Sequence, residues 1–132
     1  MKKIVIDLDG TLTMEDASRS YDDKPPNMAV IKRLREYREQ GFSISIHTAR
    51  SMRTHEGNVG LINVPSLPII LAWLDKHDVP YDEVVVGKPW CGFEGFYVDD
   101  KSIRPSEFAS MTHDEITTLL RRENPDGKGG NA

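Results

Sequence analysis

The feature that most constrains the fold is an alternation of short apolar runs with stretches of helical spacing. Residues 3–6 are almost continuously apolar, which is typical of a central strand that is covered on both faces of a parallel sheet. Residues 42–47 alternate apolar and polar side chains, and residues 83–86 and 96–98 form two further strand-like runs. Strands alternating with helices predict an α/β fold, a Rossmann-like three-layer sandwich with a mainly parallel central sheet.

Three segments have the pattern of amphipathic helices. The first is expected to begin after Asn27 and to end at Gly41, which tolerates a left-handed backbone. The second is expected to be capped by Ser66, and the third by Thr112, which has Glu115 at capping-box spacing. These helices would cover the sheet.

Three connections stand out by length and composition. Residues 13–26 are polar and end in prolines, so we expect a loop or small flap. Residues 51–65 are rich in glycine, asparagine and charge, and we expect a long loop that lines the site. Residues 87–95 are the whole link between the third and fourth expected strands, whereas parallel crossovers usually take a dozen or more residues. The usual crossover helix has no room there.

The size and charge of the chain narrow the classes of protein it can represent. Its 132 residues suit one domain, expected over residues 1–123, with a flexible tail over residues 124–132. The single cysteine, Cys91, excludes an internal disulfide. The net charge of −4 argues against nonspecific binding to nucleic acid. No signal-peptide pattern and no run of about 20 apolar residues is present, so we expect a cytoplasmic protein without a membrane partner.

Chemically active side chains follow the expected strands at their carboxyl ends. Asp7 follows the first strand, Thr48 the second, Lys88 the third, and Asp99 with Asp100 the fourth. Open parallel sheets bind ligands at this edge, so these side chains are expected to converge there. The sequence therefore predicts one site built from separate stretches of chain.

The pair Asp7 and Asp9 suits phosphoryl transfer. One carboxylate can attack phosphorus and form an acyl phosphate, while the second can protonate the departing oxygen. Gly10 allows the chain to turn sharply after them. Because phosphate and carboxylates repel one another, a hard cation with oxygen ligands, Mg²⁺, is expected. Thr48 and Lys88 could hold the phosphoryl oxygens.

Each residue taken alone has an ordinary structural explanation. An Asp-x-Asp pair can be a turn, Thr48 a hydroxyl bonded to nearby backbone, and Lys88 a solvated charge. Two adjacent acids that end an apolar strand are costly without a cation, so Asp99 and Asp100 favour a metal site. The residues gain their meaning from their order and from the strands they follow.

In order and spacing, these residues resemble the four motifs of the haloacid dehalogenase (HAD) superfamily, and the resemblance extends over residues 3–105. The matching residues are Asp7, Leu8, Asp9, Gly10, Thr11, Leu12 and Thr13 for the first motif, Thr48 within the second, Lys88 for the third, and Asp99 and Asp100 for the fourth.

The resemblance implies a role for each matched residue. Asp7 would be the nucleophile and Asp9 the general acid and then base, with Thr48 and Lys88 completing the catalytic set. Mg²⁺ would be held by Asp7, by Asp9 through its carbonyl, and by the acids of the fourth motif, either of which could ligate directly. The residues expected around the phosphate or the rest of the substrate are Gly10, Thr11, Ala49, Arg50 and Arg53; the charges of the last two could equally be merely solvated.

A narrower resemblance concerns small HAD proteins associated with capsular polysaccharide biosynthesis. It covers residues 48–60 and 97–105 and implies a phosphorylated sugar or a related metabolite as substrate.

No cap domain fits into the short segments after Asp9 or between Thr48 and Lys88, so the site is expected to be open. Capless relatives accept larger substrates or use a neighbouring subunit as a lid, which implies a bulky substrate or a homo-oligomer.

Two alternative functions remain open from the sequence. A nucleotide or nucleic-acid end phosphatase would be favoured if Arg35, Arg38, Arg50 and Arg53 formed one basic face. A receiver-like or other non-catalytic phosphoryl-binding protein would use similar residues. A receiver, however, would carry its phospho-accepting aspartate on a middle strand, where this chain has Thr48.

Overall fold

The structure, a computed structural model, describes residues 2–126. They fall into two compact units, which lie within Met1–Trp90 and Cys91–Ala132. The expectation of a single domain over residues 1–123 stays a prediction. Most of the expected tail, residues 127–132, lies outside the described residues.

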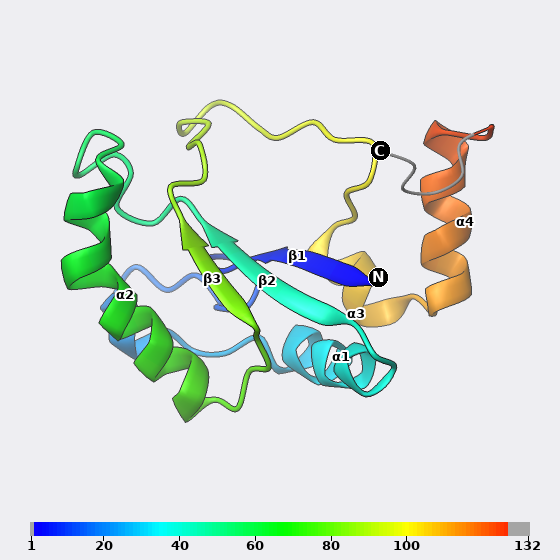
Figure 1. The fold of residues 1–132 in the computed structure, drawn as a ribbon, viewed down its shortest axis with the longest axis horizontal. Helices are drawn as coiled ribbons and strands as arrows, with labels where there is room; N and C mark the ends of the chain where they lie inside the picture. Colours follow the sequence, from blue (N-terminus) through cyan, green and yellow to red (C-terminus); the bar gives the residue numbers. More distant parts are fainter. Residues whose placement is uncertain (1, 127–132) are drawn as a thin grey trace. The chain divides into compact units, whose positions relative to one another are not determined.

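The N-terminal unit is built on a three-stranded sheet. Its strands β1 (Lys3–Asp7), β2 (Ser43–Thr48) and β3 (Glu83–Val86) are parallel and adjacent in that order. Figure 1 shows the three arrows side by side and pointing the same way. In the register, Ile4 lies beside Ile44 and Ile6 beside Ile46. The predicted α/β class, with an open parallel sheet flanked by helices in a Rossmann-like arrangement, is confirmed.

Helix α1 (Met28–Glu39) follows the predicted pattern closely. The Asn27 side chain accepts a hydrogen bond from the Val30 N–H, at 3.4 Å, and so caps the helix. Just after the helix ends, Gly41 has a φ of +92°, a conformation that glycine adopts without strain. The side chains of Ile31 and Leu34 in this helix are fully buried. Helical spacing predicts a buried face of Met28, Ile31, Leu34 and Tyr37; the last three are buried, whereas Met28 is 48% exposed.

Helix α2 (Val59–Lys76) begins earlier than the sequence pattern predicts. Its cap is Asn58, and Ser66 is a buried residue in the middle of the helix, so the predicted cap is wrong. The predicted loop over residues 51–65 is wrong beyond residue 58. Pro65 and Pro68 both lie inside the helix on its exposed side, where water can bond the carbonyls that lack an N–H partner.

Helix α2 is also unusually apolar. Within residues 2–126 it is the one helix long and apolar enough to cross a membrane by length and composition, with a mean hydropathy of 1.3. About a quarter of it is buried, 28% of that stretch, including Ile62, Ile70 and Leu74. Core helices of soluble proteins meet the same two criteria, so this observation assigns no membrane role.

The predicted flap over residues 13–26 closes on itself. A bridge between Thr13 and Pro26 joins its two ends, and a short 3₁₀ helix, η1 (Tyr21–Asp23), lies within it. The Trp73 indole N–H of α2 donates to the Lys24 carbonyl at 2.8 Å and ties the flap to that helix. This bond is buried, so the flap has a fixed attachment despite its polar composition.

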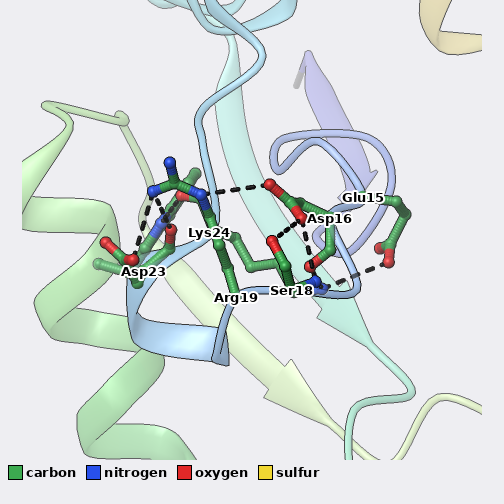
Figure 2. Close-up of polar contacts among 7 residues, drawn as sticks. Glu15, Asp16, Ser18, Arg19, Asp23 and Lys24 are labelled. Carbon is green, nitrogen blue, oxygen red and sulfur yellow. Dashed lines mark hydrogen bonds and ion pairs between the residues drawn. The ribbon is translucent and has the colours of Figure 1, made fainter.

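Polar side chains inside the flap bind one another. The Lys24 ammonium donates to the Asp16 carbonyl at 3.1 Å and lies 3.5 Å from the Glu15 carboxylate. The Arg19 guanidinium pairs with the carboxylates of Asp16 and Asp23 at 3.2 and 3.3 Å, as Figure 2 shows. These hydrogen bonds and ion pairs join charged residues within the flap and stabilise its conformation.

The C-terminal unit contains helices α3 (Pro105–Ser110) and α4 (His113–Glu123). The predicted capping box is confirmed, because the Thr112 hydroxyl accepts from the Glu115 N–H and the Glu115 carboxylate accepts from the Thr112 N–H. Phe108 of α3 and Ile116 of α4 are buried. The sequence pattern did not predict α3.

The predicted fourth strand, residues 96–98, is wrong. This stretch has no strand pairing within the described chain, and the exposed fractions of Phe96 and Val98 are 79% and 86%. Strand β1 is consequently an edge strand and not the predicted central one, with Val5 60% exposed. Residues 96–98 have the apolar composition of a strand, but a strand also needs a paired neighbour, and none is present within residues 2–126.

The burial of Leu34 leads to a stability prediction. Leu34→Ala should lower the free energy of unfolding by roughly 3 kcal/mol, because it removes a fully buried side chain and leaves a cavity. Urea denaturation followed by circular dichroism measures the change. Met28→Ala, at a half-exposed position of the same helix, is the control and should change it by less than about 0.5 kcal/mol. Equal losses in the two variants would contradict the core described here.

Candidate active site

Asp7 occupies the carboxyl end of β1 and contacts groups from two other segments. Its carboxylate accepts a hydrogen bond from the Thr11 hydroxyl at 3.1 Å and another from the Lys88 ammonium at 3.4 Å. Lys88 follows β3, and its backbone N–H donates to the Thr48 carbonyl at the end of β2, at 3.1 Å. Parallel pairing therefore brings Asp7, Thr48 and Lys88 to one edge of the sheet, as the sequence predicts.

The turn after Asp7 is formed by the backbone. The Leu8 carbonyl accepts from the N–H groups of residues 11, 12 and 13, at 2.9 to 3.3 Å. Gly10 has a φ of +82°, and its N–H donates to the Thr13 hydroxyl at 3.2 Å. Leu8 and Leu12 are buried and anchor the turn in the core. This local structure explains why a glycine follows the two aspartates.

The surroundings of Asp7 oppose its ionisation. Burial is the largest influence and raises the pKa of the Asp7 carboxyl above its ordinary value of 3.8, while the nearby Lys88 charge and the Thr11 hydrogen bond lower it. Burial outweighs the two stabilising contacts. The contacts with Lys88 and Thr11 therefore do not fully offset the cost of burying the ionised carboxylate. An additional cation would stabilise the ionised form.

Asp9 is held by a buried arginine. The Arg50 guanidinium donates from Nε to one Asp9 oxygen at 3.0 Å and from Nη2 to the other at 2.7 Å. The Arg50 side chain is 3% exposed and that of Asp9 24%. The Arg50 backbone N–H donates to the Thr48 hydroxyl oxygen at 3.0 Å, which places the arginine directly after β2. A bidentate pair of this kind fixes the orientation of both planar groups.

Tyr21 covers the same arginine from the flap. Its ring centroid lies 4.2 Å from Cζ of Arg50, within the range of a cation–π contact. The sequence pattern did not identify Tyr21 as a site residue. The only available signal was an aromatic side chain in an otherwise polar flap, and such a residue has no fixed spacing from Arg50.

The remaining predicted substrate residues lie on the segment after β2. Ala49 is half-buried and Arg53 is exposed, and Ser51 between them has a φ of +67°. Gly10 and Thr11 belong to the turn that holds Asp7. All five residues expected around the substrate therefore belong to the N-terminal unit, where Thr11 donates to Asp7 and Arg50 donates to Asp9.

Asp99 and Asp100 belong to the C-terminal unit, where both are exposed. The Asp99 carboxylate accepts from the Lys101 backbone N–H at 2.7 Å, and Asp100 accepts from the Asn124 side-chain amide. Neither lies at the end of a paired strand, contrary to the sequence prediction.

The carboxylates at the end of β1 provide only part of the ligand set that a hard cation needs. Within residues 2–126, no group of three or more His, Cys, Asp or Glu side chains is close enough to hold a metal ion. Arg50 already engages both carboxylate oxygens of Asp9. Asp7 is thus the acid whose chemistry suits Mg²⁺ in the N-terminal unit, and further oxygen ligands are required to complete a shell.

The solved structures that resemble this chain include a close match and two distant ones. No protein-family model and no curated protein matches the chain. A structure of the Pnkp1/Rnl/Hen1 complex is 20% identical with a TM-score of 0.48, and the match covers 93% of this chain and 43% of that one. A structure of the Pnkp1/Rnl/Hen1 RNA repair complex is 17% identical with the same TM-score, and the match covers 92% and 40%. Similarities this low carry no argument about function.

The close match is a crystal structure of an MCSG target from Vibrio cholerae. It is 60% identical with a TM-score of 0.91, and the match covers 93% of this chain and 99% of that one. Identity at this level over nearly the whole of both chains shows common descent, so the chain belongs to the same protein family as this Vibrio cholerae protein.

Proposed function

We propose that this protein is a Mg²⁺-dependent phosphomonoester hydrolase of the HAD type. The observation that supports it best is the convergence of Asp7, Thr11 and Lys88 at the carboxyl edge of a parallel sheet. Asp9 follows two residues later and is held by a buried arginine. A nucleophile, a positive charge and a second acid are the groups that phosphoryl transfer through an acyl phosphate needs.

The reaction would proceed in two steps. An Asp7 oxygen attacks phosphorus, the phosphorus–oxygen bond to the leaving group breaks, and Asp9 donates a proton to the departing oxygen. Water then attacks the phosphorus of phospho-Asp7 while Asp9 takes its proton, which regenerates Asp7 and releases inorganic phosphate. The two aspartates therefore have separate roles.

Fixed positive charge would stabilise the transferring group. Lys88 already points at the Asp7 carboxylate, and the Thr48 hydroxyl can still donate while it accepts from the Arg50 N–H. When bound, Mg²⁺ would offset the repulsion between phosphate and carboxylates, held by Asp7, by the carbonyl of Asp9 and by Asp99 or Asp100.

Arg50 would position Asp9 and offer a donor to the substrate. Its two hydrogen bonds set the plane of the Asp9 carboxyl group. Its third nitrogen, Nη1, is buried and has no acceptor among the described residues. A buried donor without a partner is costly, so an oxygen of the bound substrate would satisfy it.

The substrate class we propose is a phosphorylated sugar or a related metabolite of polysaccharide biosynthesis, acted on in the cytoplasm. This assignment rests on the narrower sequence resemblance.

The alternative of a nucleic-acid end phosphatase would need a basic face formed by Arg35, Arg38, Arg50 and Arg53. Arg50 is buried against Asp9, Arg35 donates to the carbonyls of His77 and Asp78, and Arg38 pairs with Asp82. Three of the four arginines on which that alternative depends are therefore engaged by groups of the chain itself.

The first test of the proposed chemistry is Asp7→Asn. Phosphate release from sugar phosphates, nucleotides and an aryl phosphate should depend on Mg²⁺, and the variant should lower it by roughly 10⁴-fold or more because the nucleophile is lost. Asp75→Asn, an exposed position near the end of α2, is the matched control and should keep full activity. Activity that survives Asp7→Asn would exclude the covalent mechanism.

The raised pKa of Asp7 predicts a pH-dependent change in stability. Burial makes the folded state bind the Asp7 proton more tightly than the unfolded state does, so this contribution is complete below the ordinary pKa of 3.8 and is lost as the pH rises. At neutral pH, Asp7→Asn should therefore raise the Tm measured by calorimetry, and the gain should vanish below pH 3.8. Added Mg²⁺ should raise the Tm of the wild type only. A lower Tm of Asp7→Asn at neutral pH would contradict the prediction.

Tyr21 should act through Arg50 and not through its hydroxyl. Tyr21→Ala removes the ring over the guanidinium and should lower kcat/KM by roughly 3- to 30-fold, the equivalent of one cation–π contact. Tyr21→Phe keeps the ring and should remain close to the wild type. Steady-state kinetics with the best substrate decide the matter, and equal losses in the two variants would assign the effect to the hydroxyl.

A further inference from the structure

We propose that Ser51 and Ser66 are positioning residues for the general acid: their hydroxyl groups bind each other and fix the direction of Arg50, which in turn holds Asp9. The role of Asp9 as the acid rests on the proposed function. The contacts themselves are independent of it, and all four residues lie within the N-terminal unit.

The orientation of Asp9 depends on the backbone on both sides of Arg50. The Arg50 side chain is 3% exposed and donates to both oxygens of the Asp9 carboxylate. Such a bidentate pair holds the two planar groups in one geometry, so a small change in the direction of the arginine breaks one of its two bonds. On the strand side, the Arg50 N–H is held by the Thr48 hydroxyl at 3.0 Å. The other side is the backbone of the next residue.

That next residue, Ser51, has an unfavourable backbone conformation. Its φ of +67° lies in the left-handed region, where the Cβ of a residue other than glycine crowds the backbone. Strained residues persist only where the surrounding structure holds them, and they cluster at functional sites. The Ser51 carbonyl accepts from the His55 N–H at 3.0 Å, which holds one side of this turn. The Ser51 side chain is held from α2.

Ser66 provides this second contact from the middle of α2. The hydroxyl oxygens of Ser51 and Ser66 lie 3.1 Å apart, within hydrogen-bond distance. Ser66 is 7% exposed and shares its helix face with Ile62 and Ile70, which are four residues before and after it and fully buried. A hydroxyl in a buried apolar stripe is costly unless it has a partner. The bond to Ser51 supplies that partner and explains a serine at this position.

The bridge of the two hydroxyls therefore joins a core helix to the arginine that orients the acid. Without the bridge, Arg50 would sample more directions, and the proton of Asp9 would less often face the departing oxygen. A general acid contributes most where the leaving group is a strong base and little where it departs without a proton. Loss of the bridge should consequently impair some substrates much more than others.

The first experiment compares two phosphate esters with Ser66→Ala. The leaving group of phenyl phosphate is a poor one that benefits from a proton, whereas that of dinitrophenyl phosphate departs unaided. The variant should lower kcat/KM by roughly 10-fold for phenyl phosphate and by less than about 2-fold for the dinitrophenyl ester. A purely structural defect lowers both values together, so equal losses would overturn the positioning role.

Ser51→Gly separates positioning from stability. Glycine adopts a φ of +67° without strain, which offsets the lost hydrogen bond, so the Tm should stay within about 2 °C of the wild type. The kcat/KM for phenyl phosphate should nevertheless fall as it does in Ser66→Ala. Wild-type kcat/KM in Ser51→Gly would overturn the proposal.

Ser43→Ala is the matched control. Its hydroxyl donates to the Lys2 carbonyl at 3.3 Å, at the opposite end of β2 from Arg50. The substitution removes one serine hydroxyl bond and should leave kcat/KM for both esters unchanged. A selective loss on phenyl phosphate in this variant as well would contradict the assignment of the effect to Ser51 and Ser66.

A second measurement needs no activity. The Arg50 Nε–H donates to Asp9, and its proton can be followed by nuclear magnetic resonance and identified by its absence in Arg50→Lys. A buried, bonded proton exchanges with water only when the structure opens locally. Ser66→Ala and Ser51→Gly should raise its exchange rate by roughly 10-fold, whereas Ser43→Ala should not.

The outcomes separate this proposal from the proposed function. Unchanged exchange in an active enzyme overturns the positioning role and leaves the proposed function standing. Faster exchange together with a selective loss on phenyl phosphate supports both. Faster exchange in a protein that hydrolyses neither ester supports the link between the two serines and Arg50 and contradicts the proposed function.

Discussion

The parallel pairing of β1, β2 and β3 is the constraint on which the rest of the structure depends. Parallel strands end at a common edge, so strand pairing brings residues that are far apart in the chain together there. Asp7 and Lys88 are 81 positions apart and lie within 3.4 Å. Ile6 of β1 and Ile44 and Ile46 of β2 are buried and anchor these two strands in the core.

The charged side chains at that edge, of which Arg50 is buried and the other three are partly buried, form two pairs. Asp7 faces Lys88, and Asp9 faces Arg50, whose backbone is bonded to Thr48. Removing ionised groups from water is costly, and each pair recovers part of that cost through close contact. For Asp7 the compensation is incomplete, because burial still raises its pKa. An additional positive charge near Asp7 would therefore stabilise its ionised form.

Caps and turns that local chemistry decides were predicted correctly from the sequence, whereas features that depend on long-range packing were not. The caps at Asn27 and Thr112 and the turn at Gly41 depend on neighbouring residues and were predicted correctly. The start of α2 was wrong, since two prolines within the helix are tolerated only because they lie on its exposed side. Residues 96–98 have the apolar composition of a strand, but a strand also requires a partner.

The sequence by itself determined the α/β class and the candidate groups at the ends of β1, β2 and β3, because apolar periodicity and residue order express both directly. Tertiary structure alone decided that Arg50 pairs with Asp9, that the Tyr21 ring contacts Arg50, and that β1 is an edge strand of the three-stranded sheet. These features depend on distances between segments that local sequence does not encode.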